Sequence, residues 1–285
     1  TFPAPPRTRS RSPAVVLGNF FASPQAAADW QTHYPHGTLV PIAEDFEVNR
    51  EAMAKLGWTA NPTSTPTSKD VAELSQPGGA LDLGHDPARV AVRMIRLLAQ
   101  AGRPVTRDHA LDAVAESGVD HATADALLDA WTERNDSGEI VGLGITSNPT
   151  PHRMTIDGVP MWAWCGMDTL IFVHLLDKPA TIESKAPGSG EVVRLHADPS
   201  GITEVDPAGA VATQRVPGRD QVDLSTKNGI WGTFCHHNFF FPNRAEAAKW
   251  AAGRDDIAIL SIPDAFATAR DIAGALLRYE PKGPQ

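Results

Sequence analysis

The sequence predicts an α+β protein in which an N-terminal extension and a helical domain precede a mixed or antiparallel sheet flanked by helices. Three observations predict this class. Apolar residues recur at helical spacing through the middle of the chain, short runs rich in β-branched and aromatic residues follow, and a strand pattern and a long helical pattern end the chain. With 285 residues, of which 42% are hydrophobic, the chain can bury a sizeable core.

Charge and composition exclude several classes of function. The chain carries 25 Lys and Arg against 34 Asp and Glu, and its net charge of -9 is unfavourable for binding nucleic acid, because phosphate contacts need clustered cations. Charged residues interrupt the longest apolar stretches and no signal-peptide pattern is seen, so we expect a cytoplasmic protein without a membrane segment. Two cysteines exclude a disulfide scaffold and a four-cysteine zinc site. They leave one bridge, two inert thiols or one two-thiol site.

The first part of the chain is expected to lie outside the main domains. Residues 1–13 are rich in Pro, Arg and Ser and predict a flexible arm, and residues 58–85 have the composition of a linker. Between them, residues 14–57 repeat part of the C-terminal end, with an offset of one residue. The matches are Asn19–Phe21 with Asn238–Phe240, Trp30 with Trp250, Ile42 with Ile262, Phe46 with Phe266 and Arg50 with Arg270. We therefore expect a partial copy of the C-terminal strand–helix unit that serves packing or dimerisation.

Residues 86–160 predict a winged-helix-like domain. Asp86 is a good N-cap for its first helix, and Gly102 ends that helix. The helical patterns are followed by two strand patterns that we expect to pair as a hairpin. These patterns lie at residues 86–101, 108–116, 121–134, 139–145 and 153–156. Such a domain can bind DNA or serve as structure alone. Its acidic residues outnumber its arginines, which disfavours DNA.

Residues 161–280, which carry both cysteines, predict a further domain of helices and short strands. Helices are expected from Asp168 to Leu176, over 244–252, and from Pro263 to Leu277, where Pro suits the first helical turn. Short strand-like runs supply the sheet. They are Thr181–Ser184, Val192–Ala197, Ala210–Val216, Ile230–Phe241 and Ile257–Leu260.

Cys165 and Asp168 stand three residues apart at the start of a predicted helix. A helix N-terminus offers free N–H groups and partial positive charge, which favour a thiolate over a thiol. Residues i and i+3 share one helix face, so the thiol and the carboxyl group can address one small ligand. Asp168 can equally be a plain N-terminal cap. The Cys-x-x-Asp pattern alone therefore leaves a structural role open.

Cys235 lies in an aromatic run, between Phe234 and two adjacent histidines. On a regular strand, His237 would share the face of Cys235 and His236 would point the other way. Cys235 is then either a buried small hydrophobic residue or a ligand. The histidines are either surface residues or members of a metal site.

Several motifs occur in the order of one known family. They are Ala101–Val105, Gly138–Gly144, Trp162–Leu170 with its Trp-Cys-x-x-Asp-Thr-Leu run, and Phe234–His237 followed by Phe239 and Phe240. Through them the chain resembles the organomercurial lyase (alkylmercury lyase) family over about residues 86–280. The extension of residues 1–84 lies outside the usual pattern of that family.

The resemblance implies protonolysis of carbon–mercury bonds, which turns R–Hg⁺ into R–H and Hg(II). It implies that residues 161–280 form the catalytic domain and that Cys165 and Cys235 are the thiolates that hold mercury. It implies that Asp168 is the proton carrier and also belongs to the mercury-binding group. No organic cofactor is implied, organomercurials are the substrates, and a thiol or a mercuric reductase accepts the Hg(II). A homodimer is a further expectation. The residues expected around the three groups are Trp164, Phe234, His236 and His237.

Departures from the family pattern keep other functions open. His236 and Ala186 stand where many members have further cysteines, although neither position belongs to the reacting trio. His236 beside Cys235 would suit copper or zinc. The alternatives are a metal-binding or sensing protein for Hg or Cu that does not cleave C–Hg bonds, and a lyase-like enzyme with another substrate. Asp168 favours an enzyme, because a metal trap needs no proton donor.

Overall fold

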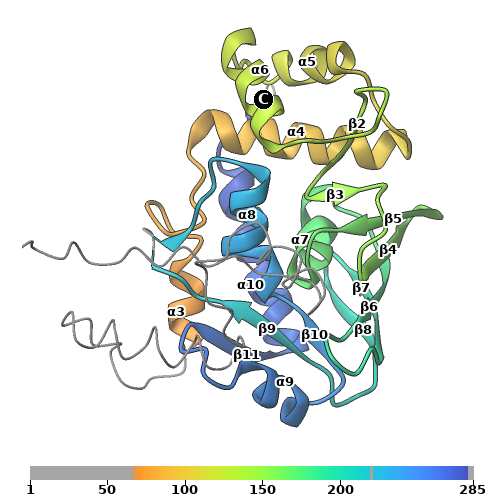
Figure 1. Ribbon diagram of the computed structural model, residues 1–285, viewed down its shortest axis with the longest axis vertical. Coiled ribbons are helices and arrows are strands. Elements are labelled where there is room, and N and C mark those ends of the chain that lie inside the picture. Colours follow the sequence, from red (N-terminus) through yellow and green to blue (C-terminus); the bar gives the residue numbers. More distant parts are fainter. Residues whose placement is uncertain (1–65, 67, 219–220, 282–285) are drawn as a thin grey trace, which may run out of the picture. The chain divides into compact units, whose positions relative to one another are not determined.

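The computed structural model describes residues 66, 68–218 and 221–281, so the predicted arm (1–13) and partial repeat (14–57) lie outside the described residues. The described residues belong to one compact unit, Thr63–Gln285. It combines helices with two antiparallel sheets (Figure 1), which confirms the mixed helix and sheet composition expected from the sequence. Within the described part of the chain, no helix is long and apolar enough to cross a membrane.

The larger sheet has eight strands in the order β1-β2-β3-β5-β4-β6-β7-β8. Buried and exposed side chains alternate along β6 and β7, as expected for a sheet with one face on the core. Ile182 and Leu195, for example, pair across these strands and are both buried. The strands are β1 (Glu133–Arg134), β2 (Ile140–Leu143), β3 (Ile145–Thr146), β4 (His152–Ile156), β5 (Val159–Ala163), β6 (Ala180–Lys185), β7 (Val192–Asp198) and β8 (Gly201–Asp206).

The buried helix α7 (Gly166–Leu176) packs against the larger sheet and against α10 (Ile262–Leu277), as Figure 1 shows. Leu170, Phe172 and Val173 are all buried. A helix that is apolar on all sides has no face for solvent, which fits this central position. Because α7 starts three residues after β5 ends, the sheet fixes where the N-terminus of the helix lies.

The smaller sheet has the order β10-β9-β11 and is also antiparallel. The helix α9 packs on it, and the segment from β9 to β10 contains α8 and the short 3-10 helix η2. The elements are β9 (Val211–Arg215), α8 (Lys227–Thr233), η2 (Cys235–His237), β10 (Phe240–Phe241), α9 (Arg244–Ala251) and β11 (Ile257–Ser261). The predicted helix over 244–252 and the predicted strand over 257–260 are thereby confirmed.

The three helices predicted between residues 86 and 134 form close to the expected positions, just before the larger sheet. Gly102, with φ 59, ends the first of these helices. Thr106 and Asp120 begin the second and the third, because their side chains accept backbone N–H groups of the first helical turn. The helices are α4 (His85–Ala101), α5 (Arg107–Ala115) and α6 (His121–Trp131).

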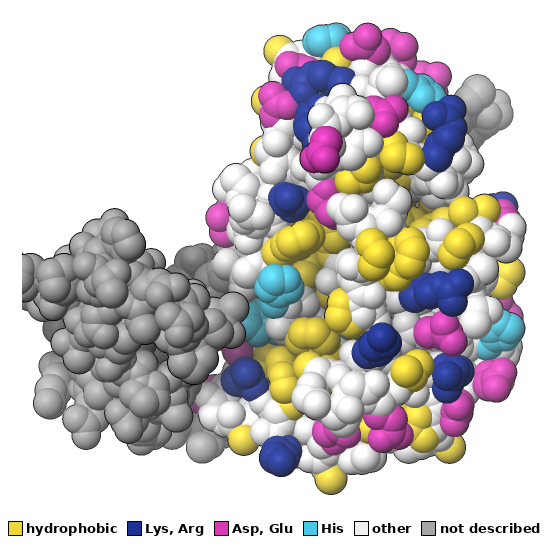
Figure 2. All heavy atoms as spheres, turned by 45° about the vertical axis from the view of Figure 1, so that its right-hand side comes forward, with side chains coloured by type: hydrophobic (Ala, Val, Ile, Leu, Met, Phe, Trp, Pro, Cys, Tyr) yellow, Lys and Arg dark blue, Asp and Glu magenta, His cyan; other side chains and the backbone are white. Residues whose placement is uncertain are grey.

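The charges of these helices compensate one another. Arg107 pairs with Asp125 and Asp129, and Arg134 also reaches Asp129. On the face drawn in Figure 2, Lys and Arg side chains are interspersed with Asp and Glu over the helical part.

The predicted hairpin between residues 139–145 and 153–156 is wrong. β2 pairs with β1 and β3, whereas β4 pairs with β5 and β6. The physical reason is Gly144, whose φ of 71 reverses the chain and splits the first run into two short strands. The three helices are therefore not followed by a separate two-stranded wing, because these strands continue into the larger sheet.

The predicted linker over residues 58–85 is wrong for its second half. The helix α3 (Ser68–Glu73) forms there and packs against α10 and β11, with Val71 and Leu74 buried. Within this segment, Pro77 and Gly78 lie in turns and Gly79 lies in a bend. Asp86 is also not the N-cap of α4, because Gly84 takes that position and Asp86 lies in the first turn.

Candidate active site

Cys165 is the N-cap of α7, as the sequence predicts, and Asp168 is the third residue of that helix. Asp168 Oδ2 accepts a hydrogen bond from the backbone N–H of Cys165 at 3.1 Å, and the backbone N–H of Asp168 faces the Cys165 sulfur in return. This reciprocal arrangement is that of a capping box, with cysteine in the place of serine. The local sequence therefore holds the thiol and the carboxyl group side by side at the helix start.

Cys235 comes from the other side of the site, and the strand predicted over Ile230–Phe241 is wrong there. The chain instead forms α8, which Thr226 caps by accepting the N–H of Gly229 at 3.0 Å, and then η2, which contains Cys235. The backbone N–H of Gly166 donates to Asn238 O at 2.9 Å. This bond ties the segment after Cys235 to the start of α7.

Gly166 permits this close approach. A Cβ atom at that position would lie 3.3 Å from Asn238 O and 3.3 Å from the ring of Phe240. Such contacts are tight enough that a larger residue would push the two segments apart. The glycine between Cys165 and Asp168 thus has a packing reason.

The structure brings the three sequence-predicted groups together. The ligand atoms of Cys165, Asp168 and Cys235 all lie within 4.8 Å of one another, and Cys235 Sγ is 3.9 Å from Asp168 Oδ2. Both cysteines are buried and free, and Asp168 is half-buried. Of the three meanings that the sequence left for two cysteines, the geometry favours one two-thiol site.

Burial sets the electrostatics of this site. Desolvation raises the pKa of the Asp168 carboxyl group to about 7, although hydrogen bonds with both thiols act in the opposite direction. Desolvation also raises the pKa of Cys165, so the lowering expected from the helix N-terminus is outweighed. The hydrogen bond with Cys165 and then burial raise the pKa of Cys235 well above its usual value. Near neutral pH, both thiols are therefore protonated, whereas the Asp168 carboxyl group is present in both its protonated and its ionised form.

Buried aromatic residues precede both cysteines in the chain. The indole of Trp164, next to Cys165 in the chain, donates its N–H to the buried Glu133 and meets Trp231 edge-on, with ring centroids 5.6 Å apart. Phe234, next to Cys235, is buried. Trp164 and Phe234 are among the residues expected from the sequence, whereas nothing in the local sequence of Trp231 and Glu133 links them to the cysteines.

The two histidines lie outside the three-atom group. His236 is exposed, and its ring lies against Trp231 with centroids 5.7 Å apart. His237 Nε2 lies 3.1 Å from the carbonyl oxygen of Gly232, and burial lowers the pKa of His237. Among the described residues, the cluster that could hold a metal ion contains no histidine. The expected sharing of a strand face by His237 and Cys235 fails because this segment is helical.

No motif in the sequence indicates two further buried polar residues, Asn238 and His152. Asn238 is fully buried, and its Nδ2 atom lies 4.0 Å from Cys165 Sγ. His152 is buried in β4, with Nδ1 2.7 Å from Ser184 Oγ, and burial lowers its pKa to about 4. Asn238 stands three residues after Cys235, and this proximity was the one signal that could have revealed it.

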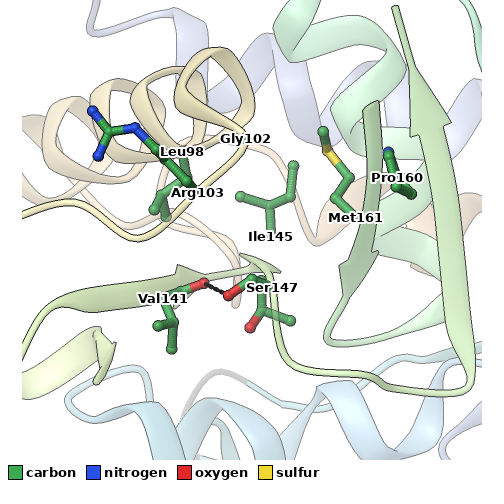
Figure 3. Close-up of a pocket in the computed structure, with 9 residues that line it drawn as sticks. Leu98, Gly102, Arg103, Val141, Ile145, Ser147, Pro160 and Met161 are labelled. Atoms are coloured by element: carbon green, nitrogen blue, oxygen red, sulfur yellow. Dashed lines mark hydrogen bonds between the residues drawn. The ribbon is translucent and has the colours of Figure 1, made fainter. Parts of the chain in front are cut away.

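A small pocket lies apart from the thiols, where the end of α4 meets β2, β3 and β5 (Figure 3). Leu98, Ile145 and Met161 give it apolar walls, and Arg103 and Ser147 lie at its edges. Cys165, Asp168 and Cys235 do not line it, so it is separate from the candidate active site.

A buried pair of thiols beside a carboxyl group with a pKa near neutrality could hold a thiophilic metal next to a group able to exchange a proton. Comparison with known proteins agrees. The family model MerB, alkylmercury lyase, matches residues 145–274. An alkylmercury lyase of Pseudomonas putida is 33% identical over 213 residues, which cover 74% of this chain and 93% of that protein. The chain belongs to the alkylmercury lyase family of enzymes.

Further relatives support this assignment. An alkylmercury lyase of Streptomyces lividans is 33% identical over 65% of this chain and 81% of its own length. A crystal structure of the mercury-bound form of MerB2 matches the fold with a TM-score of 0.58, over 73% of this chain and 99% of that one. Its sequence identity is 18%, so this likeness concerns the fold.

Proposed function

We propose that this protein cleaves carbon–mercury bonds by protonolysis, with Cys165 and Cys235 as mercury ligands and Asp168 as the proton carrier. The observation that carries the proposal is the convergence of two buried thiols and one carboxyl group within 4.8 Å. Mercury is a soft metal for which thiolates are the preferred protein ligands. A carboxyl group with a pKa of about 7 can both accept and give a proton near neutral pH.

The first step is thiol exchange. An organomercurial arrives as R–Hg–SR′, one cysteine sulfur takes the place of R′S on mercury, and the thiol proton leaves with R′SH. The resting site can start this exchange with both thiols protonated, as their raised pKa values require. The second thiol then passes its proton to the Asp168 carboxylate and binds mercury as a thiolate. Cys235 Sγ, 3.9 Å from Asp168 Oδ2, is placed for this transfer.

The second step breaks the carbon–mercury bond. Two thiolates raise the electron density on mercury and on the carbon bound to it. The Asp168 proton moves to that carbon, R–H leaves with the electron pair of the C–Hg bond, and Asp168 returns to the carboxylate. Hg(II) stays on both sulfurs until another thiol takes it, for which we expect a small thiol or a mercuric reductase. The reaction needs no organic cofactor, and the rings of Trp164 and Phe234 help to exclude water.

The proposal is tested by incubating the reduced protein with methylmercury or phenylmercury and excess thiol. We expect methane or benzene in amounts exceeding the protein. The Asp168→Ala variant should still bind the organomercurial but release little hydrocarbon, because the proton carrier is gone. If the wild-type protein retains stoichiometric mercury and forms no hydrocarbon, the proposed reaction is refuted and the alternative of a mercury-binding protein is supported. Full turnover by Asp168→Ala would refute the role of the carboxyl group.

A further inference from the structure

Asn238 joins the two segments that carry the cysteines. Its backbone N–H donates to Cys235 O at 3.2 Å, and its backbone carbonyl accepts the N–H of Gly166 at 2.9 Å. The residue is fully buried. Its position is therefore fixed with respect to both the Cys235 turn and the start of α7.

The side chain of Asn238 has one possible orientation. Its Oδ1 atom accepts the backbone N–H of Arg215 at 2.7 Å, and a backbone N–H can face only an acceptor, so the oxygen and nitrogen of the amide are not interchangeable. Arg215 is held in turn by an ion pair with Asp256 at 2.7 Å. The amide nitrogen of Asn238 is thereby directed at Cys165 Sγ, 4.0 Å away.

The contact is asymmetric between the two thiols. Among the described residues, the Cys165 sulfur is the acceptor recorded for Asn238 Nδ2, and the backbone N–H of Asp168 also faces this sulfur. The contacts of the Cys235 sulfur are with Cys165 and the Asp168 carboxyl group. A separation of 4.0 Å is long for a neutral thiol. A negative sulfur attracts an N–H more strongly, and this amide gives up no other acceptor by moving toward it.

We propose that Asn238 is a positioning residue whose side-chain N–H holds the Cys165 sulfur and stabilises its negative charge as it binds an electrophile. The inference deepens the proposed function, in which Cys165 is a mercury ligand. Asn238 thereby makes Cys165 the more reactive of the two thiols. A purely structural asparagine would act only through Oδ1 and the Arg215 N–H.

Two substitutions separate these roles. Asn238→Asp keeps an acceptor for the Arg215 N–H but replaces the N–H donor near the sulfur with an oxygen. Asn238→Leu has a similar size and loses both. Thr213→Val is the matched control, because Thr213 Oγ1 bonds His237 O and Phe239 N, both at 3.0 Å, in the same turn without touching a cysteine. All variants are compared by circular dichroism and thermal unfolding.

The readout is the rate at which iodoacetamide alkylates each cysteine, resolved by peptide mass mapping over a series of pH values. We expect Cys165 to be alkylated fastest in the wild type, about tenfold more slowly in Asn238→Leu, and most slowly in Asn238→Asp. In both variants, the pH profile of Cys165 alkylation should be displaced to higher pH. Cys235 in the same molecules is the internal control and should change less. Thr213→Val should react like the wild type.

Two results for the alkylation rate of Cys165 would overturn the inference. If Asn238→Asp reacts like the wild type while Asn238→Leu is slow, the role of Asn238 is structural. An equal loss in Thr213→Val would also overturn it, by showing general loosening. Should Asn238→Leu fail to fold, the comparison of Asn238→Asp with the wild type decides by itself. Thiol rates need no organomercurial, so missing hydrocarbon in the wild type refutes the proposed function without altering this result.

Discussion

Replacing Asp168 with Asn should stabilise the protein at neutral pH. The folded state raises the pKa of this carboxyl group from 3.8 to about 7, mainly by desolvation. The unfolded state is ionised above its own pKa, whereas the folded state keeps its proton up to about pH 7. Between these values the folded state binds more protons, so its free energy of unfolding falls as the pH rises. A shift of about 3 pH units corresponds to about 4 kcal/mol at most.

The Asp168→Asn side chain would carry no charge at any pH, and its amide oxygen could still accept the N–H of Cys165. We therefore expect the free energy of unfolding of the variant to exceed that of the wild type by about 2 to 4 kcal/mol above pH 7 and by little below about pH 4. The lower figure allows for solvent screening, because Asp168 is only half-buried. The measurement is urea unfolding of both proteins under reducing conditions, at a series of pH values across this window. The difference between the two unfolding free energies should grow with pH.

Asp120 supplies a control of opposite sign. This exposed N-cap of α6 accepts the backbone N–H of Thr123 at 3.0 Å, and hydrogen bonds with Thr123 lower its pKa. Asp120→Asn keeps the cap but removes a charge that the folded state favours. Any loss in the free energy of unfolding should therefore appear above the pKa that Asp120 has in the unfolded chain, and should vanish in acid. Unfolding free energies of the wild type and Asp168→Asn that run parallel across the pH range would refute the raised pKa of Asp168.

Three further outcomes are expected. Cys165→Ser or Cys235→Ser should abolish hydrocarbon release from phenylmercury while leaving the circular dichroism spectrum unchanged, because a hydroxyl is a poor ligand for soft mercury. Glu133→Ala should lower the free energy of unfolding in urea by about 2 kcal/mol, because the buried Trp164 N–H loses its acceptor. Deleting residues 1–62 should leave a folded protein. Deleting residues 1–84 should leave much of the protein unfolded, as measured by thermal melting, since α3 with its buried Val71 is lost together with the buried Leu74 that follows it.

Local features of the site were predictable because their causes are local. The helix after Cys165 follows from a run of apolar residues, and the i and i+3 spacing is enough to place Asp168 beside the thiol. The approach of Cys235 was not predictable from spacing, because 3-10 geometry and the contact of Gly166 with Asn238 decide it. It was expected only through the family resemblance.

The errors share one physical origin, which is tertiary packing that overrides local composition. The aromatic run around Phe234 has the composition of a strand, yet it forms a helix and a 3-10 turn that carry Cys235 to α7. The segment before α4 has the composition of a linker, yet Val71 and Leu81 bury their side chains. The direction of the Cys165 pKa was likewise missed, because the helix N-terminus is visible in the sequence and the degree of burial is not.

Burial raises the pKa of both thiols, which opposes nucleophilic attack but suits the proposed reaction. A site with resident thiolates would have no thiol proton to give to Asp168 when the substrate binds. Protonated thiols instead release their protons only as mercury replaces them, and Asp168, with a pKa of about 7 and 3.9 Å from Cys235 Sγ, is placed to accept one. The same desolvation that holds the thiols neutral makes Asp168 a strong enough base for the thiol proton and a strong enough acid for the carbon. Substrate binding would thus protonate Asp168, which then gives this proton to the carbon as the C–Hg bond breaks.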